Sequence, residues 1–248
     1  MTQHFGLLGK SLKHSFSKSF FSNYFSDKGI NADYENIELV SEADLEVFLK
    51  KDVYKFKGLN VTIPYKETVI PFLHELTPEA RKIGAVNTIK IKNNKLTGHN
   101  TDAYGFHQSI KPFLTNQHEK ALILGTGGAS KAIAFVLKNI GIDIFYISHS
   151  KAGDRIFPYN AVNNHMLRAC KCIVNTTPVG MFPNEQEMID FPYQYLTADH
   201  LVVDLIYNPE ETLFLKAAKE QGAMTLNGLT MLKEQALEAW RFWNNGKY

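Results

Sequence analysis

Three side chains able to hydrogen-bond a polar ligand lie close together in the stretch GLNVTIPYK, residues 58–66. If this stretch is a strand, Asn60 and Thr62 share one face, because the side chains of a strand alternate between its two faces. Pro64 then ends the strand, and Lys66 follows it. An amide, a hydroxyl and an ammonium at the end of a strand predict a site for a polar molecule. The alternative is an edge strand with a hydrated face, ended by its proline.

A glycine-rich turn with the sequence GTGGAS, residues 125–130, is the second place where residue types suggest a function. It follows an apolar strand and precedes a helix and a further apolar strand. In dinucleotide-binding folds such a turn brings a pyrophosphate to the helix N-terminus, and glycine is needed because a Cβ would block the approach. Ser130 stands where the commonest pattern has its third glycine. The turn predicts nucleotide binding; the alternative is a tight turn in a ligand-free sheet.

The second apolar strand ends in Ser148-His149-Ser150-Lys151 and carries no carboxylate. A site for NAD usually has Asp or Glu about 20 residues after the glycines, where it binds the ribose 2′-hydroxyl. Hydroxyls and a cation suit a 2′-phosphate better. The segment therefore favours NADP over NAD, and the alternative is a solvated turn.

The elements that must position these residues differ between the two halves of the chain. In the first hundred residues we predict strands at 4–9 and 32–39, helices near 17–27 and at 42–50, and a hairpin at 87–99 around Asn93-Asn94. From residue 120, apolar strands alternate with helices. Strands are expected at 170–177 and 201–207, followed by a helix at 212–222 and a final long helix at 230–243.

The fold class that follows is α/β. The near-continuous apolar content of the later strands predicts a parallel sheet covered on both faces. We therefore expect an N-terminal α/β domain plus a Rossmann-like, doubly wound dinucleotide-binding domain.

Composition limits the functions to be considered. The 248 residues are 44% hydrophobic and 21% charged, which is typical of a globular protein of one or two domains. A net charge of +2 gives no reason to expect nucleic acid or an anionic membrane as a partner. We expect no membrane span, because no apolar run is long enough, and no secretory signal, because the start lacks a basic segment followed by a long apolar core. We also expect no disulfide and no metal site, since the only cysteines, Cys170 and Cys172, would point to opposite faces of a strand. A cytoplasmic protein that binds a small molecule fits these observations.

Eight segments, in order along nearly the whole chain, resemble the shikimate dehydrogenase family: GLLGKSLKHSFSKSFFSNYF, GLNVTIPYKETV, IGAVNTI, GHNTDAYGF, GTGGASKA, NTTPVGM, DLIYNPEETLFLKAAKEQG and NGLTMLKEQA. The resemblance implies reversible, NADPH-dependent reduction of 3-dehydroshikimate to shikimate, in the chorismate and aromatic amino acid pathway. It also implies a substrate-binding domain, residues 1–101 completed by the C-terminal helix 228–248, and an NADP-binding Rossmann domain, residues 102–227. A monomer or a homodimer is expected.

The family's matching positions imply which side chains would hold the substrate. Ser15 and Ser17 would bind its carboxylate, and the remaining positions would contact its hydroxyls or carboxylate: Asn60, Thr62, Asn87, Tyr207 and Gln235. Ordinary structural roles are open for single members of this set. Serine at position 17 is a common helix cap, and asparagine at position 87 is a common turn residue.

Lys66 and Asp102 match the family's positions for proton transfer. Reduction of a ketone by hydride leaves negative charge on the oxygen, so a nearby cationic acid both stabilises and protonates it. If Pro64 opens a helix, Lys66 lies in its first turn. The alternatives are a solvated lysine and, for Asp102, a helix N-cap.

The resemblance further implies a set of cofactor contacts, which are Gly125, Thr126, Gly127, Gly128, Ala129, Ser148, His149, Ser150, Lys151, Thr176, Ile206, Gly228 and Met231. One departure affects this set. The family's usual Asn-Arg-Thr after the second strand is Ser148-His149-Ser150 here, so an arginine that would bind the phosphate is missing. Lys151 or Arg155 could replace it.

Two other functions stay open from the sequence. The departure at His149 leaves room for a quinate/shikimate dehydrogenase that prefers NAD. A non-catalytic ligand-binding protein on the same scaffold is the alternative of another class. The presence of both Lys66 and Asp102 argues against that second alternative.

Overall fold

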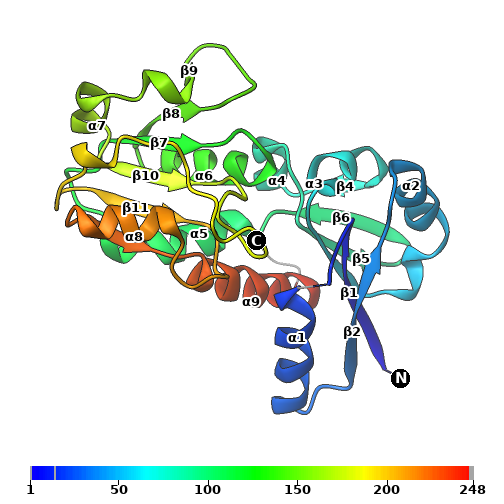
Figure 1. The fold of residues 1–248 in the computed structure, drawn as a ribbon. Coiled ribbons are helices and arrows are strands. Elements are labelled where there is room, and N and C mark those ends of the chain that lie inside the picture. The colour runs from blue at the N-terminus through cyan, green and yellow to red at the C-terminus, as the bar shows by residue number, and fades with distance from the viewer. Residues whose placement is uncertain (1, 14, 246–248) are drawn as a thin grey trace. The chain divides into compact units, whose positions relative to one another are not determined.

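The computed structural model describes residues 2–13 and 15–245, and Figure 1 shows its ribbon. The chain divides into two compact units. The first runs up to Thr101 and includes the residues from Ala236 onward, and the second is Asp102–Gln235. The division falls within the last helix, α9 (Leu229–Asn245), whereas the sequence placed the domain boundary at residue 228.

The first unit is built on a mixed six-stranded sheet with the order β2-β1-β3-β5-β6-β4. Its strands are β1 (Gln3–Gly9), β2 (Ala32–Glu38), β3 (Gly58–Val61), β4 (Glu75–Leu76), β5 (Thr88–Lys92) and β6 (Lys95–His99). The predicted hairpin is confirmed, because β5 and β6 pair antiparallel. Asn93 and Asn94 between them have φ of 52° and 58°. Positive φ at both central residues is what a two-residue hairpin turn requires.

The stretch 58–61 forms β3, and all four of its residues are buried. This strand lies between β1, which is parallel to it, and β5, which is antiparallel. The alternative of an edge strand with a hydrated face is therefore wrong. Because β3 is central, the amide side chain of Asn60 has to find its hydrogen-bond partners inside the protein.

Helices α1 (Phe16–Asp27), α2 (Glu42–Lys51), α3 (Tyr65–Thr68) and α4 (Pro78–Ile83) also belong to the first unit. They help to form two separate hydrophobic clusters. Leu7 lies in the cluster that contains Phe21 of α1, and Leu8 lies in the cluster that contains Leu45 of α2. Successive residues of β1 thus point to opposite faces, so both faces of the sheet are covered.

The end of α9 is part of the first unit's core. The indole Nε1–H of Trp243 donates to the carbonyl oxygen of Ile89 at 3.0 Å. A Cβ added to Gly58 would lie 2.3 Å from that nitrogen, so only glycine lets β3 and the indole approach this closely. The C-terminal helix is therefore anchored on the same strand that carries Asn60.

The second unit is a parallel six-stranded sheet with the order β12-β11-β10-β7-β8-β9. Its strands are β7 (Lys120–Leu124), β8 (Asp143–Ile147), β9 (Ile156–Phe157), β10 (Cys172–Asn175), β11 (Leu201–Asp204) and β12 (Met224–Leu226), and its helices include α5 (Asp102–Ile110), α6 (Gly128–Asn139), α7 (Asn164–Ala169) and α8 (Leu213–Glu220). The order reverses between β7 and β10, and doubly wound sheets bind ligands at the carboxyl ends of such strands. The predicted fold class is confirmed.

In the part of the chain that the structure describes, no helix is both long and apolar enough to cross a membrane.

His99, at the end of β6, makes stability depend on pH. Its side chain is 1% exposed, its Nδ1 lies 2.9 Å from Thr77 Oγ1, and burial lowers its pKa from 6.5 to about 4. The folded state therefore binds the proton less tightly than the unfolded state. We expect this histidine to reduce the free energy of unfolding by up to about 3 kcal/mol as the pH falls from 6.5 to 4. Denaturant titrations of the wild type and His99→Asn at pH 7 and pH 4.5 measure the effect.

The variant should lose less stability than the wild type between the two pH values. His165→Asn, which changes an exposed histidine, should keep the wild-type loss. An equal loss in the wild type and His99→Asn would show that the histidine is not the group responsible.

Candidate functional site

The glycine turn between β7 and α6 is closely packed on one side and open on the other. Gly125 has a φ of +101°, and a Cβ there would lie 2.8 Å from Thr176 Oγ1. By contrast, a Cβ on Gly127 would meet nothing within 4 Å. Ser130, at the third glycine position, is buried and its hydroxyl donates to the Gly127 carbonyl at 2.6 Å. The turn thus leaves an open cradle of backbone at the start of a twelve-residue helix.

Thr176 and Thr177 follow β10 directly and border this turn. The hydroxyl of Thr176 donates to the carbonyl of Leu124 at 2.7 Å, which ties the end of β10 to the end of β7. Both polar groups of Thr177, its amide and its hydroxyl, donate to Asn175 Oδ1, at 2.9 and 2.7 Å. The carboxyl ends of β7 and β10 are therefore held together at the point where the strand order reverses.

Asp204, at the end of β11, supports the same edge and was missed from the sequence. Its carboxylate is fully buried and accepts from Asn175 Nδ2, from the Ile206 amide and from the Thr212 hydroxyl, at 3.0, 3.0 and 2.7 Å. Burial raises its pKa to about 6, and these three donors offset part of the rise. The carboxylate positions the segments that carry Thr177 and Ile206.

The segment after β8 contains the predicted phosphate-binding residues. Ser148 is buried, and its Oγ accepts from the amides of Ser150 and Lys151 at 3.3 and 3.1 Å. The ammonium of Lys151 reaches back to the glycine turn and donates to the Thr126 carbonyl at 3.4 Å. His149 is exposed and stacks on Tyr159, with the ring centroids 4.1 Å apart. Of the two cations considered from the sequence, Lys151 is thus the one beside the turn.

Arg155, the other cation, is engaged elsewhere. Its guanidinium pairs with Asp143 at 3.2 Å and lies 5.3 Å from the centre of the Phe145 ring. Asp143 begins β8, whereas the phosphate segment follows the opposite end of that strand. The structure therefore gives no support to Arg155 as the replacement for the family's arginine.

The residues expected near the nicotinamide lie just after β11 and where β12 leads into α9. Gly228 donates its amide to the Ile206 carbonyl at 2.9 Å, and a Cβ on it would lie 2.0 Å from the Leu205 oxygen. Met231 is buried, and its carbonyl oxygen would lie 2.5 Å from a Cβ on Gly105 of α5. This part of α9 is thus fixed against both β11 and α5.

Tyr207 and Gln235 are half-buried in this same unit. The Gln235 amide donates to the Leu232 carbonyl at 3.0 Å. Asp102 is the first residue of α5 and is 6% exposed. Three of the predicted substrate or catalytic residues therefore belong to the second unit.

In the first unit, Asn60 is 5% exposed and has partners at both ends of its amide. Its Oδ1 accepts from the Tyr34 hydroxyl at 2.8 Å, and its Nδ2 donates to the Asn87 carbonyl at 3.3 Å and to Thr88 Oγ1 at 3.2 Å. Burial raises the pKa of Tyr34, and a hydrogen bond with Ser17 offsets part of that rise. Tyr34 links Asn60 to Ser17, a contact that sequence reasoning missed.

Asn87 continues this network toward Asp102. Its Oδ1 accepts from the Thr101 amide at 2.7 Å, and its Nδ2 donates to the Thr101 hydroxyl at 3.0 Å. The side chain of Asn87 therefore sets the backbone immediately before Asp102. The turn role considered from the sequence is too simple, because Asn87 is buried and binds a residue 14 positions away.

Lys66 is the second residue of the short helix α3, which follows Pro64. Its side chain is half-buried, and its carbonyl oxygen accepts from the Val86 amide at 2.7 Å. Val86 precedes Asn87, so the backbone that carries the ammonium is tied to the asparagine network. Thr62, which directly follows β3, is also half-buried.

Ser15 and Ser17 flank the start of α1. Ser15 is the N-cap residue, but its side chain caps no helix amide, and its Oγ is buried without a hydrogen-bond partner. Ser17 lies within the first turn of the helix, so the alternative of Ser17 as the N-cap is wrong. A buried hydroxyl without a partner is uncommon and marks a place for a polar ligand.

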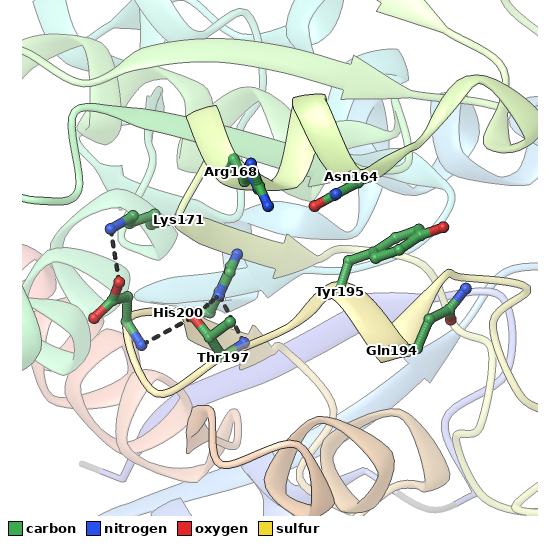
Figure 2. Close-up of a pocket in the computed structure, with 8 residues that line it drawn as sticks. Asn164, Arg168, Lys171, Gln194, Tyr195, Thr197 and His200 are labelled. Carbon is green, nitrogen blue, oxygen red and sulfur yellow. Dashed lines mark hydrogen bonds and ion pairs between the residues drawn. The ribbon is translucent and has the colours of Figure 1, made fainter.

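A separate cavity of about 490 Å³ lies at the amino ends of β10 and β11 (Figure 2), and its lining residues are Asn164, Arg168, Lys171, Gln194, Tyr195, Thr197, Asp199 and His200. Lys171 is paired with Asp199 at 2.9 Å, and both ring nitrogens of His200 lie 3.0 Å from backbone groups. The glycine turn is at the opposite edge of this sheet. The cavity therefore shares no residue with the predicted site.

Among the described residues, no three His, Cys, Asp or Glu side chains are placed to hold a metal ion. Cys170 and Cys172 are free and buried, and burial raises their pKa values to about 11 and about 12. The groups gathered at the two parts of the candidate site are instead amides, hydroxyls, two lysines and buried carboxyls.

Comparison with known proteins supports the assignment suggested by these residues. The family model described as "Shikimate dehydrogenase substrate binding domain" matches residues 7–89. A curated "Shikimate dehydrogenase (NADP(+))" of Aquifex aeolicus is 40% identical over 250 residues, covering 98% of this chain and 91% of the relative.

Two solved structures show the range of ligands among similar proteins. A shikimate 5-dehydrogenase of Thermus thermophilus in complex with NADP(H) and shikimate has a TM-score of 0.83 and 30% identity, covering 98% of this chain and 93% of the other. A quinate dehydrogenase of Corynebacterium glutamicum in complex with NAD has a TM-score of 0.87 and 30% identity, covering 98% and 94%. The likeness extends over nearly the full length of both.

Proposed function

Because the chain belongs to the shikimate dehydrogenase family, we propose that it catalyses the reversible, NADPH-dependent reduction of 3-dehydroshikimate to shikimate, in aromatic amino acid biosynthesis. The observation that carries the proposal is the 40% identity to a curated NADP-dependent relative over nearly the whole of both chains. In this assignment the first unit supplies most of the substrate contacts, and the second binds the cofactor and contributes Asp102, Tyr207 and Gln235.

Lys66 and Asp102 are the proposed acid–base pair. NADP, when bound, supplies or accepts the hydride. Lys66 donates a proton to the ketone oxygen in reduction and takes it back in the reverse direction, and its positive charge stabilises the negative charge that develops there. Asp102 is buried at the start of α5, where it assists the transfer. Two neighbouring residues support this role, because the Val86 amide binds the Lys66 carbonyl and the Asn87 side chain binds Thr101, the residue before Asp102.

The substrate's polar groups are assigned to the buried hydroxyls and amides. Ser15 and Ser17 bind the carboxylate, for which the Ser15 hydroxyl without a partner is the main support. The remaining substrate contacts are Asn60, Thr62, Asn87, Tyr207 and Gln235. Neutral hydrogen-bonding groups suit a small ring that carries hydroxyls, because a site that pairs each hydroxyl rejects analogues lacking it.

The cofactor is assigned to the carboxyl edge of the second sheet. The open backbone at Gly127 and the start of α6 fit a pyrophosphate, which the helix N-terminus attracts. Lys151 is the proposed partner of the 2′-phosphate, with Ser148 and Ser150 beside it. Gly228, Ile206 and Met231 are assigned to the nicotinamide end. The residues present therefore fit NADP.

An NAD-preferring quinate/shikimate dehydrogenase is the second candidate. It is favoured by one observation, the exposed His149 stacked on Tyr159 where the family usually has arginine. A similar protein of known structure is a quinate dehydrogenase in complex with NAD. Lys151 beside the glycine turn favours NADP instead.

Initial rates with shikimate and with quinate, each with NADP and with NAD, test the proposal. Turnover of shikimate with NADP is the expected result. Turnover only with NAD, or a preference for quinate, would replace it with the second candidate. Folded protein that binds shikimate but converts neither compound would instead be a ligand-binding protein on this scaffold.

Gly127→Ala tests the cofactor site separately from folding. A Cβ at this position meets no atom of the protein, so the thermal unfolding midpoint without cofactor should stay that of the wild type. The same Cβ would oppose the approach of a pyrophosphate, so KM for NADP should rise about tenfold or more. An unchanged KM in Gly127→Ala would move the pyrophosphate away from this turn.

A further inference from the structure

The segment between β1 and α1 carries Ser15 and leads into the first turn of α1, which carries Ser17. Side chains of β2 hold the backbone of this segment. Glu38 Oε1 accepts from the Leu12 amide at 2.6 Å. Asn36 Nδ2 donates to the Leu12 carbonyl oxygen at 3.1 Å. The amide and the carbonyl of Leu12 are thus each bound by a side chain, and these two side chains lie two positions apart on β2. We call Asn36, Glu38 and the backbone of Leu12 the Leu12 clamp.

The clamp is connected directly to Ser15. The Leu12 carbonyl that Asn36 binds also accepts from the Ser15 amide, at 3.0 Å. Leu12 itself is 3% exposed and belongs to the cluster of α1 and β1, so the clamped residue is also fixed by packing. Movement of the Leu12 peptide would therefore move the Ser15 backbone and its hydroxyl.

Two buried side-chain atoms lack a hydrogen-bond partner within the described residues. One belongs to the clamp, and the other belongs to the residue whose amide binds the Leu12 carbonyl. They are Ser15 Oγ and Asn36 Oδ1. Buried polar atoms are almost always paired, so two exceptions in one place mark a site organised for something other than stability. Glu38 adds a charge-assisted hydrogen bond, which is stronger than one between neutral groups.

We propose that Asn36 and Glu38 are positioning residues, which act through the Leu12 backbone to hold the Ser15 hydroxyl ready for the substrate's carboxylate. The inference rests on the proposed function. Neither side chain contacts the reacting atoms in this assignment, so substrate affinity should depend on them and the chemical step should not. Tyr34 lies on the same face of β2, two residues before Asn36, and its side chain forms a hydrogen bond directly with Ser17.

Steady-state kinetics with shikimate and NADP test the proposal in the full-length protein. Glu38→Ala and Asn36→Ala should each raise KM for shikimate about tenfold, the effect of one net hydrogen bond. The value of kcat and KM for NADP should stay near those of the wild type. Glu38→Gln keeps an oxygen that accepts from the Leu12 amide but loses the charge, so its KM should lie between those of the wild type and Glu38→Ala. Glu35→Ala is the matched control, because it removes the same charge from the opposite face of β2.

A double-mutant cycle separates a role through Ser15 from an independent one. In a Ser15→Ala background, adding Glu38→Ala should raise KM for shikimate little further. Additive effects of the two substitutions would overturn the inference, and so would a KM for shikimate that stays unchanged in both Glu38→Ala and Asn36→Ala. In either case, turnover of shikimate by the wild type would leave the proposed function standing. If Asn36→Ala lowers the unfolding midpoint, the KM of Glu38→Ala decides whether the clamp positions Ser15, because Glu38 is exposed and its loss should not affect folding. No shikimate turnover by the wild type would overturn both.

Discussion

Replacing Lys66 with alanine is expected to lower kcat for shikimate oxidation by roughly 10²–10⁴-fold, the usual contribution of a positioned acid or base. The protein should still fold, because the side chain is half-buried and the hydrogen bond from Val86 goes to the backbone carbonyl, which the variant keeps. Initial rates at saturating shikimate and NADP measure the loss. The thermal unfolding midpoint, compared with that of the wild type, shows whether folding is intact.

Lys82→Ala is the control for this loss. Lys82 is an exposed lysine near the end of α4, so the change removes the same charge from the same unit without reaching the candidate site. It should leave kcat unchanged. Wild-type kcat in Lys66→Ala would show that another group transfers the proton, and the assignment of Lys66 as the acid would then be wrong even if the protein is a dehydrogenase.

Much of the fold could be predicted because its signals are local. The Asn93-Asn94 pair between alternating residues specified a hairpin, since asparagine accepts the positive φ that such a turn needs. A strand followed by the turn GTGGAS, a helix and a second strand predicted the start of a doubly wound sheet, because glycine allows the tight turn between strand and helix. Each of these patterns depends on backbone conformations within a few residues, which the residue types themselves favour.

The position of the stretch 58–66 in its sheet could not be predicted with the same certainty. Alternation and a following proline fit both an edge strand and a central one. The pairing partners decide the matter, and both β1 and β5 are distant from β3 in the sequence. Packing between distant segments has no local signature.

The side chains that support the candidate site were missed for the same reason. Asp204 and Asn175 meet across two neighbouring strands, 29 residues apart in sequence, and Tyr34 reaches Asn60 over 26 residues. Their residue types are ordinary for a strand end or a half-buried strand. Only the order of the strands brings them together, so the family's motifs pointed to the groups expected to contact ligands and not to those that hold them.

Gly228→Ala should have the largest effect on stability. The added Cβ would lie 2.0 Å from the Leu205 carbonyl oxygen and 2.5 Å from its carbon, and backbone atoms cannot rotate away as a side chain can. The position is also fixed by hydrogen bonds, from the Gly228 amide to Ile206 and from the Leu232 amide to Gly228. We expect a loss of about 3 kcal/mol in the free energy of unfolding, at the upper end of the usual range for overpacking. Denaturant titration without cofactor measures it.

Gly127→Ala is the matched control, since it adds the same methyl group to the same unit where nothing lies within 4 Å. It should leave the free energy of unfolding unchanged, although it is expected to weaken NADP binding. The two variants therefore separate two reasons for a glycine at this edge of the sheet. Gly228 is required by the fold, because its neighbour is the protein's own backbone. Gly127 is not required by the fold, because no protein atom lies within 4 Å of the added Cβ, and in the proposed assignment the pyrophosphate requires it. Wild-type stability in Gly228→Ala would mean that the junction of β12 and α9 can move away from Leu205, and Ile206 and Met231 would then no longer be held as a fixed surface for the nicotinamide.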